Sequence, residues 1–329
     1  MHTDNAFTID RPRLNAELRV GEAALLLGDR HTLVSREVPQ AVLERTLRRM
    51  DGTAALDRIV AAEPALPRAA ADELIAALDG LGLLDDTALP AFRTGSDVIL
   101  ELEELVEARC ETTIYRNPFW QTCLAAHAPG DLPQRLATGM VIENWHFLFR
   151  ESYFDAPVLS YVPNTAVRLL LDEFFSEEYG HDEILLRSLQ HVGLSYADMQ
   201  DAIPLPETMA LCNALAYWAH NDPLFFFATL GLLEGQGMKE DSFIEACTRV
   251  GMDDAFVGPL RTHANINIGA GHGNLTRLIF QQIPAIAAAD VRRLKAQMPL
   301  FVDLYDAFYT GVWRHYTSDA PLLRRVSEL

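Results

Sequence analysis

The sequence predicts a mainly α-helical protein in which a helical bundle follows a small domain of strands and helices. From about residue 95 onward, apolar residues recur at three- and four-residue steps in segments that end at proline or glycine. Before that point, short apolar runs precede three short helical segments. Strands and helices do not alternate, and no GxGxxG or P-loop motif is present, which excludes a doubly wound nucleotide-binding fold.

Short apolar runs interrupted by glycine occupy residues 17–34, a pattern typical of small strands joined by turns. In the three helical segments that follow, leucine, isoleucine and valine recur at helical steps, and Gly52, Pro64 and Gly80 mark the ends. Strands beside a compact helical trio predict a winged-helix-like α+β domain, which we assign to residues 1–90.

The second predicted domain, residues 95–329, is almost wholly helical. It contains no apolar run of the roughly 18 to 20 residues that a membrane-spanning helix needs, so we expect no such helix. The periodicity predicts helices near residues 96–113, 117–127, 134–152, 165–192, 206–220, 222–238, 240–250, 253–268 and 289–316.

The composition is that of a soluble globular protein, with 49% hydrophobic and 22% charged residues. The 27 basic and 46 acidic residues give a formal net charge of −19, which would repel phosphate backbones and anionic lipids, so we expect neither nucleic acid nor a membrane as partner. The four cysteines show no zinc-like spacing and the N-terminus shows no signal-peptide pattern. We therefore expect reduced core thiols in a cytoplasmic protein; a homodimer is one expectation for its assembly.

The stretch "FFSEEYGHDEILLRSL", residues 174–189, places two carboxylates and an imidazole within one predicted helical turn. Glu178 and His181 are three positions apart and project from the same helix face. Because Glu178 lies closer than Glu177 to the apolar stripe, we expect Glu178 inside the protein and Glu177 in solvent. A carboxylate and an imidazole at this spacing are iron or manganese ligands in helix bundles, although a surface Glu–His pair gives the same pattern.

Two later segments carry further candidate ligands. Glu234 stands alone in an apolar helix, where a carboxylate is costly unless it is paired or bound to a metal. His263 and Asn267 lie one turn apart in a subsequent helix. His272 follows His263 by nine residues, which is about 180° around an unbroken helix, so it joins the others only if the intervening glycines break the helix.

The segment "MVIENWHFLFRESYF" places Glu143, His146 and Arg150 on one helix face. Glu143 and His146 are candidates for supplementary ligands or for a general acid–base pair, and Arg150 is a candidate for holding a substrate carboxylate. The alternative is a helix face that is hydrogen-bonded to its neighbours. We expect the aromatic residues Trp145, Tyr153 and Trp218 and the "LFFF" run in the core or in the walls of a pocket rather than in electron transfer.

These segments together resemble the heme-oxygenase-like superfamily, a seven-helix bundle that includes thiaminase II, the PQQ synthase and the heme-oxygenase-like diiron oxidases. The likeness covers roughly residues 95–317 and is carried by "IENWHFLFRESYF", "EEYGHDEILLRSLQHVGL", the lone glutamate and "THANINIGAGH". In the diiron oxidases, a glutamate and a histidine of one core helix, a glutamate of a later helix and a His-x3-Asp-x2-His run hold the metal. By position, the resemblance implies as ligands Glu178, His181, Glu234 and His263.

The last run departs from that pattern, because Asn267 stands in place of the aspartate and Ala270 in place of the second histidine. His272 is the remaining candidate near that end of the helix. The sequence therefore supports one well-ligated Fe(II) better than two, with O2 as co-substrate, and leaves one or two ions open.

The first 90 residues resemble the peptide-recognition elements of enzymes that mature ribosomally made peptides, including the small PQQ chaperone. The strand-rich start, the "LRRMDGTAALDRIV" turn and the closing "ELIAALDGLGLLDD" carry this likeness. It implies that a leader peptide adds as an extra strand to the wing, where main-chain hydrogen bonds hold it.

Three functions compete. The first is an iron-dependent, O2-activating oxidase or oxygenase that acts on a precursor peptide or a small amino-acid-derived substrate in natural-product biosynthesis. The second is a cofactor-free oxidase like the PQQ synthase, which stoichiometric iron would exclude. The third is a non-catalytic carrier of a peptide. A carrier does not need a buried set of carboxylates and histidines, which counts against this function.

Overall fold

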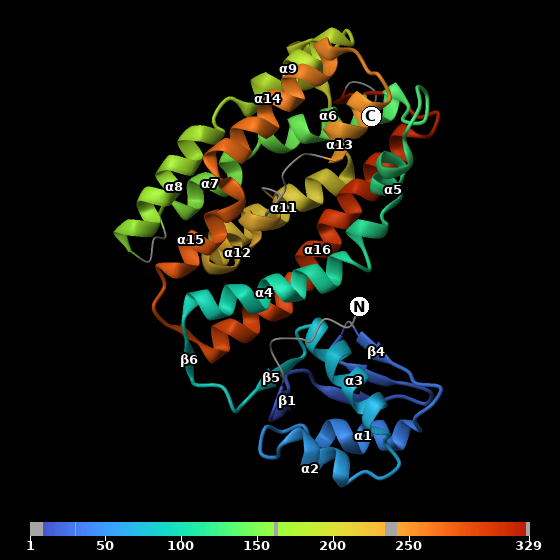
Figure 1. Ribbon diagram of the computed structural model, residues 1–329, viewed down its shortest axis with the longest axis vertical. Helices are drawn as coiled ribbons and strands as arrows, with labels where there is room; N and C mark the ends of the chain where they lie inside the picture. The colour runs from blue at the N-terminus through green and yellow to red at the C-terminus, as the bar shows by residue number, and fades with distance from the viewer. Residues whose placement is uncertain (1–8, 30, 161–163, 234–241, 327–329) are drawn as a thin grey trace. The chain divides into compact units, whose positions relative to one another are not determined.

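The computed structural model describes residues 9–29, 31–160, 164–233 and 242–326 (Figure 1). It is mainly helical, as the sequence predicts. A division into domains of residues 1–90 and 95–329 stays a prediction.

By their internal contacts, the residues group into two compact units. The smaller unit comprises residues 1–105 and 285–299, and the larger comprises residues 106–284 and 300–329. The division falls inside two helices, α4 (Gly95–Cys110) and α16 (Ala288–Tyr316).

The smaller unit contains short antiparallel strands in its described part. They pair in the orders β1–β5, β2–β3–β4 and β6–β7. The β2–β3–β4 sheet lies where the sequence predicts strands. The strand bounds are β1 (Pro12–Leu14), β2 (Leu18–Val20), β3 (Leu25–Leu27), β4 (His31–Leu33), β5 (Leu84–Asp86), β6 (Phe92–Arg93) and β7 (Ile286–Ala287).

Three helices of the same unit confirm the predicted helical trio, with bounds α1 (Gln40–Arg49), α2 (Leu56–Ala61) and α3 (Arg68–Gly80). Their apolar faces meet the inner side chains of β3 in a common core that includes Leu25, Leu47, Ile59 and Leu78. Burial of these side chains stabilises the fold because each removes apolar surface from water.

The larger unit is built from helices, and the described helices of its interior pack closely: α9 against α14 and α6, α11 against α7, and α12 against α15. Their bounds are α5 (Pro118–Ala125), α6 (Gln134–Leu148), α7 (Ser152–Val158), α8 (Thr165–Glu178), α9 (His181–His191), α10 (Tyr196–Asp201), α11 (Pro206–Asn221), α12 (Pro223–Leu233), α13 (Ser242–Arg249), α14 (Asp254–Ala270) and α15 (Leu275–Gln281).

The prediction of one continuous helix over residues 165–192 is wrong. The chain forms α8 and α9, with Gly180 between them in the left-handed region at φ +95°. Glycine reaches this conformation without the steric cost of a Cβ, so it separates the helices where hydrophobic periodicity alone suggests continuity. The short helices α7, α10 and α15 were not predicted as separate elements, because few apolar repeats fit into one or two turns.

The core of the larger unit contains the predicted aromatic residues. Trp145 is 1% exposed, and Phe225 to Phe227 of α12 are fully buried. The expectation for Tyr153 is wrong, since this side chain lies on the surface with 64% of its area exposed. All four cysteines are buried, and none of them forms a disulfide. Within the described residues, no helix combines the length and the apolar character that crossing a membrane requires.

Candidate metal centre

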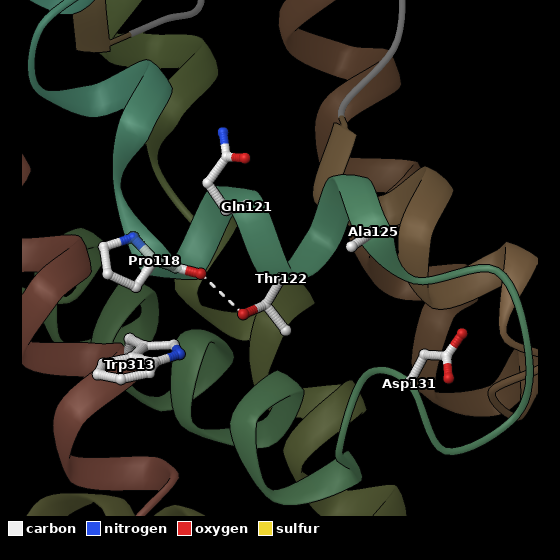
Figure 2. Close-up of a pocket in the computed structure, with 6 residues that line it drawn as sticks. All are labelled: Pro118, Gln121, Thr122, Ala125, Asp131 and Trp313. Atoms are coloured by element: carbon white, nitrogen blue, oxygen red, sulfur yellow. Dashed lines mark hydrogen bonds between the residues drawn. The ribbon is translucent and has the colours of Figure 1, made fainter.

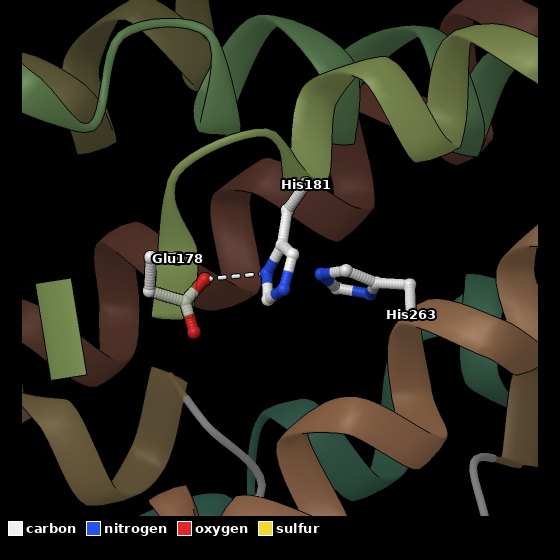
Figure 3. Close-up of side chains that lie close together, drawn as sticks. All are labelled: Glu178, His181 and His263. Carbon is white, nitrogen blue, oxygen red and sulfur yellow. Dashed lines mark hydrogen bonds and ion pairs between the residues drawn. The ribbon is translucent and has the colours of Figure 1, made fainter. Parts of the chain in front are cut away.

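A tight turn brings Glu178 and His181 together. Glu178 is the last residue of α8 and His181 the first of α9, and the left-handed Gly180 separates the two helices. His181 Nδ1 lies 2.7 Å from Glu178 Oε2 (Figure 3). Both residues are buried, at 3% and 2% exposure, which confirms that Glu178 points inward. The pair therefore meets through a turn between two helices rather than along one helix face.

The third side chain of the centre comes from α14. Asp253 caps the start of this helix, with its side chain accepting a hydrogen bond from Ala255 N, and the helix packs along α9. This packing sets the ring of His263 edge-on to the ring of His181, with ring centroids 4.7 Å apart. Potential ligand atoms of Glu178, His181 and His263 all lie within 4.8 Å of one another (Figure 3).

His272 reaches the same carboxylate from beyond the end of α14. The helix stops at Ala270, Gly271 adopts the left-handed region at φ +75°, and a 3₁₀ turn, His272–Asn274, follows. The break turns the imidazole back, so that His272 Nδ1 lies 2.9 Å from Glu178 Oε1 and Nε2 lies 2.8 Å from Glu177 Oε2. Glu178 thus has an imidazole at each carboxylate oxygen.

The electrostatics of the centre favour a charged carboxylate at Glu178 and a neutral imidazole at His263. Burial raises the pKa of Glu178, but hydrogen bonds from His181 and His272 outweigh it and lower that pKa to about 2. Burial, together with the neighbouring His181, lowers the pKa of His263 to about 4. At neutral pH, Glu178 is therefore ionised and His263 is uncharged, as metal ligands must be.

The unpaired atoms of the centre fit a bound cation. Among the described residues, the buried Nε2 atoms of His181 and His263 have no hydrogen-bond partner. In the neutral His181 tautomer whose Nδ1–H donates to Glu178, Nε2 carries the lone pair that a metal ion needs. One carboxylate and two imidazoles make a hard-to-borderline donor set that suits iron or manganese.

Comparisons with known proteins agree with this architecture. A solved structure of a domain of unknown function with a heme oxygenase-like fold, from Shewanella denitrificans OS217, superposes with a TM-score of 0.53. It is 17% identical in sequence and covers 66% of this chain and 93% of its own. This chain has a heme-oxygenase-like fold. Residues 143–306 also match the model of a family described as iron-containing redox enzymes. No curated protein matches the chain.

Within this heme-oxygenase-like fold, the family match includes the positions of all six predicted metal ligands. The structure brings together Glu178, His181, His263 and His272. Asn267 is half-buried on α14, one turn after His263. Glu234 lies outside the described residues. The assignment of these side chains as ligands stays a prediction.

The predicted residues Glu143, His146 and Arg150 divide into two groups; the first two lie on α6, and Arg150 follows the end of that helix. Glu143 is buried and accepts hydrogen bonds from Leu205 N at 3.0 Å, from Tyr316 Oη at 2.9 Å and from Thr208 Oγ1 at 2.5 Å. These contacts correspond to the alternative of a helix face hydrogen-bonded to its neighbours. Burial raises the pKa of Glu143 more than these hydrogen bonds lower it.

His146 and Arg150 form the second group. Arg150 Nη1 lies 3.0 Å from His146 Nδ1, and the imidazole is fully buried. Burial and the adjacent guanidinium lower the pKa of His146 to about 3, which keeps the ring neutral at physiological pH.

One contact of the centre was not foreseen. Glu177 was expected in solvent, and its side chain is indeed 40% exposed, but its carboxylate also contacts His272. The signal in the sequence is the pair of glycines, Gly180 and Gly271, that end the two helices beside these residues. Glycine directly after an acidic or histidine-bearing helix indicates a turn that can redirect the neighbouring side chains.

Proposed function

We propose that the heme-oxygenase-like part of the chain binds Fe(II) through Glu178, His181 and His263 and acts as an O2-dependent oxidase or oxygenase. The observation that carries the proposal is the convergence of these three side chains from α8, α9 and α14, with two imidazole Nε2 atoms buried and unpaired among the described residues. A buried polar atom without a partner is costly, and a metal ion would satisfy both atoms at once. The match of residues 143–306 to an iron-containing redox family supports iron as that ion.

When bound, iron would supply the redox chemistry with dioxygen that the side chains of the protein lack. The protein's own contribution is to fix the donors. Glu178 accepts the Nδ1 proton of His181 and so holds the ring with Nε2 inward. Phe174 packs edge-on against His272 at 4.9 Å between ring centroids, and Phe174 and Phe175 are 4% and 3% exposed. These phenyl rings keep water away from the carboxylate.

We propose that each chain binds one iron ion rather than two. Each ring nitrogen of His272 already lies within 3 Å of a glutamate oxygen, so this histidine is better suited to orient Glu178 than to bind a second ion. Asn267 is a weaker ligand than the aspartate of the related pattern because it carries no charge. A second iron would depend on Glu234.

A second part of the proposal is that the N-terminal domain delivers the substrate. In the described part of the β2–β3–β4 sheet, β4 (His31–Leu33) is an outer strand that pairs with β3. An outer strand of this kind presents backbone groups to which an extended peptide can add. We propose as substrate a precursor peptide or a small amino-acid-derived molecule of natural-product biosynthesis.

Anaerobic Fe(II) titration monitored by Mössbauer spectroscopy tests the metal assignment. Wild type is expected to bind one iron per chain, whereas Glu178→Ala and His263→Ala should bind it at least about tenfold more weakly. His220→Ala is a matched control, because His220 is an exposed histidine of α11. Equal iron binding by all four proteins would remove the ligand assignment. Oxygen uptake by the iron-loaded protein then tests the oxidase, and iron binding without uptake would reject it.

A further inference from the structure

Two neighbouring side chains of α6 carry hydrogen-bond donors that the protein leaves unused. His146 is fully buried and Trp145 is 1% exposed. Their rings meet edge-on with centroids 5.2 Å apart. Among the described residues, neither His146 Nε2 nor Trp145 Nε1 has a hydrogen-bond partner.

The contact with Arg150 determines which nitrogen of His146 carries the proton. A guanidinium group has N–H donors and no acceptor, so Arg150 Nη1 must donate to His146 Nδ1 across their 3.0 Å separation. Nδ1 is therefore the acceptor, and the proton of the neutral ring is on Nε2. Both His146 Nε2–H and the indole Nε1–H of Trp145 are donors.

The predicted carboxylate on this helix face, Glu143, is not available to these donors. Glu143 already accepts hydrogen bonds from Leu205, Thr208 and Tyr316. A buried donor without an acceptor is rare in folded proteins and indicates a ligand, an ordered water or an ion that is not part of the chain. The positive charge of Arg150 beside His146 makes an anionic acceptor the best match.

We propose that Trp145, His146 and Arg150 form a binding subsite for the carboxylate of a small organic ligand, with His146 acting as a neutral hydrogen-bond donor. The subsite deepens the proposed function, because it assigns a carboxylate-bearing substrate to the oxidase. Trp145 and His146 lie on α6, and Arg150 follows the end of that helix. Helix α6 packs against α9, the helix that begins with His181. An uncharged group of the same shape would forfeit the interaction with the guanidinium.

NMR spectroscopy of the metal-free, ¹⁵N-labelled full chain tests the subsite independently of iron. The probes are acetate and benzoate, each compared with its uncharged amide, acetamide or benzamide. The chain has four tryptophans, so the indole signal of Trp145 can be assigned by its loss in Trp145→Phe. Long-range ¹H–¹⁵N spectra should show His146 protonated at Nε2 before any ligand is added.

We expect at least one of the two carboxylates to shift the Trp145 Nε1–H and His146 Nε2–H signals saturably. The matched amide should bind at least about tenfold more weakly, as should the carboxylate to Arg150→Met and to His146→Phe. Retained dispersion of the other indole signals controls for the fold of each variant. Three results would each overturn the proposal: no saturable shift with either carboxylate, equal binding of acid and amide, or a His146 ring protonated at Nδ1. An ordered water would then account for the donors. None of these outcomes bears on Fe(II) binding by Glu178 and His263, so the two proposals fail separately.

Discussion

His181 Nδ1 lies 2.7 Å from Glu178 Oε2 although the two residues belong to different helices. Between them the chain passes through Gly180 at φ +95°, a conformation that side-chain-bearing L-residues rarely adopt. The geometry of the candidate metal centre therefore depends on one left-handed glycine, which holds the last residue of α8 against the first residue of α9.

Replacing Gly180 with alanine should weaken both stability and iron binding. No atom lies within 4 Å of the position that the new Cβ would take, so the cost is backbone strain alone, about 1–2 kcal/mol in the free energy of unfolding. If the turn relaxes to relieve this strain, Glu178 and His181 separate. Urea unfolding and anaerobic Fe(II) titration measure the two effects.

Gly130→Ala is the matched control, because Gly130 has the same φ of +95° and equally open surroundings in the loop between α5 and α6. It should lose similar stability and keep its iron affinity. Equal iron affinity in the two variants would show that the turn at Gly180 does not set the ligand geometry.

The sequence predicts most of the fold because amphipathic periodicity is a local signal. The strands of residues 17–34, the helical trio and the long helices of the bundle all follow from it. The break between α8 and α9 does not, since Phe174, Leu185 and Leu189 keep one apolar stripe across the junction. Gly180 is a single residue in a helical pattern, and only its left-handed conformation in the structure shows that it ends a helix.

The candidate site is predictable to a similar extent. Glu178 is placed inside by its spacing from the apolar stripe, and the burial of Glu178 confirms this. The approach of His272 to Glu178 depends on the angle at which the chain leaves Gly271, and sequence spacing carries no information about that angle. The same holds for the contact between His272 and Glu177, because each requires tertiary geometry.

Binding of iron should raise the melting temperature of the wild-type protein. A ligand that binds only the folded state stabilises it by about 2.7 kcal/mol when its free concentration is 100 times the Kd. Differential scanning fluorimetry under argon, with and without Fe(II), measures the shift. His181→Ala should lose it, since this removes one of the two unpaired imidazole nitrogens. His127→Ala, which changes an exposed histidine, should retain the full shift, and an equal loss there would contradict a specific site.

The stability of the metal-free protein should decrease as the pH is lowered, in part because of His146. Its pKa in the folded state is lowered to about 3 from 6.5, chiefly by burial. Between these two pKa values, His146 is protonated in the unfolded chain but neutral in the folded protein. The contribution of neutral His146 to stability is therefore fully present above the unfolded pKa and is lost progressively as the pH falls below it. The slope is at most about 1.4 kcal/mol per pH unit.

His146→Phe removes this group and should unfold with a correspondingly smaller pH dependence. Urea unfolding of wild type and variant at about pH 5 and about pH 7 compares the slopes. Near pH 7 the variant should be no less stable, since an unpaired buried donor costs about 1–3 kcal/mol that phenylalanine does not incur. Parallel pH profiles would contradict a buried, neutral His146.

The packing of α6 against α16 at Gly139 should be intolerant of a single methyl group. A Cβ on Gly139 would lie 2.1 Å from Tyr316 Cγ, so the ring would have to move, and Tyr316 Oη would leave Glu143 Oε1, from which it is now 2.9 Å. Gly139→Ala should therefore lower the free energy of unfolding by about 1–3 kcal/mol through overpacking. Gly269→Ala is the opposite case: its Cβ would meet no atom within 4 Å inside α14, and alanine should stabilise that helix by about 0.5–1 kcal/mol. Urea unfolding of both variants gives the sign of each change, and a stable Gly139→Ala protein would mean that the Tyr316 ring does not fix the position of α6.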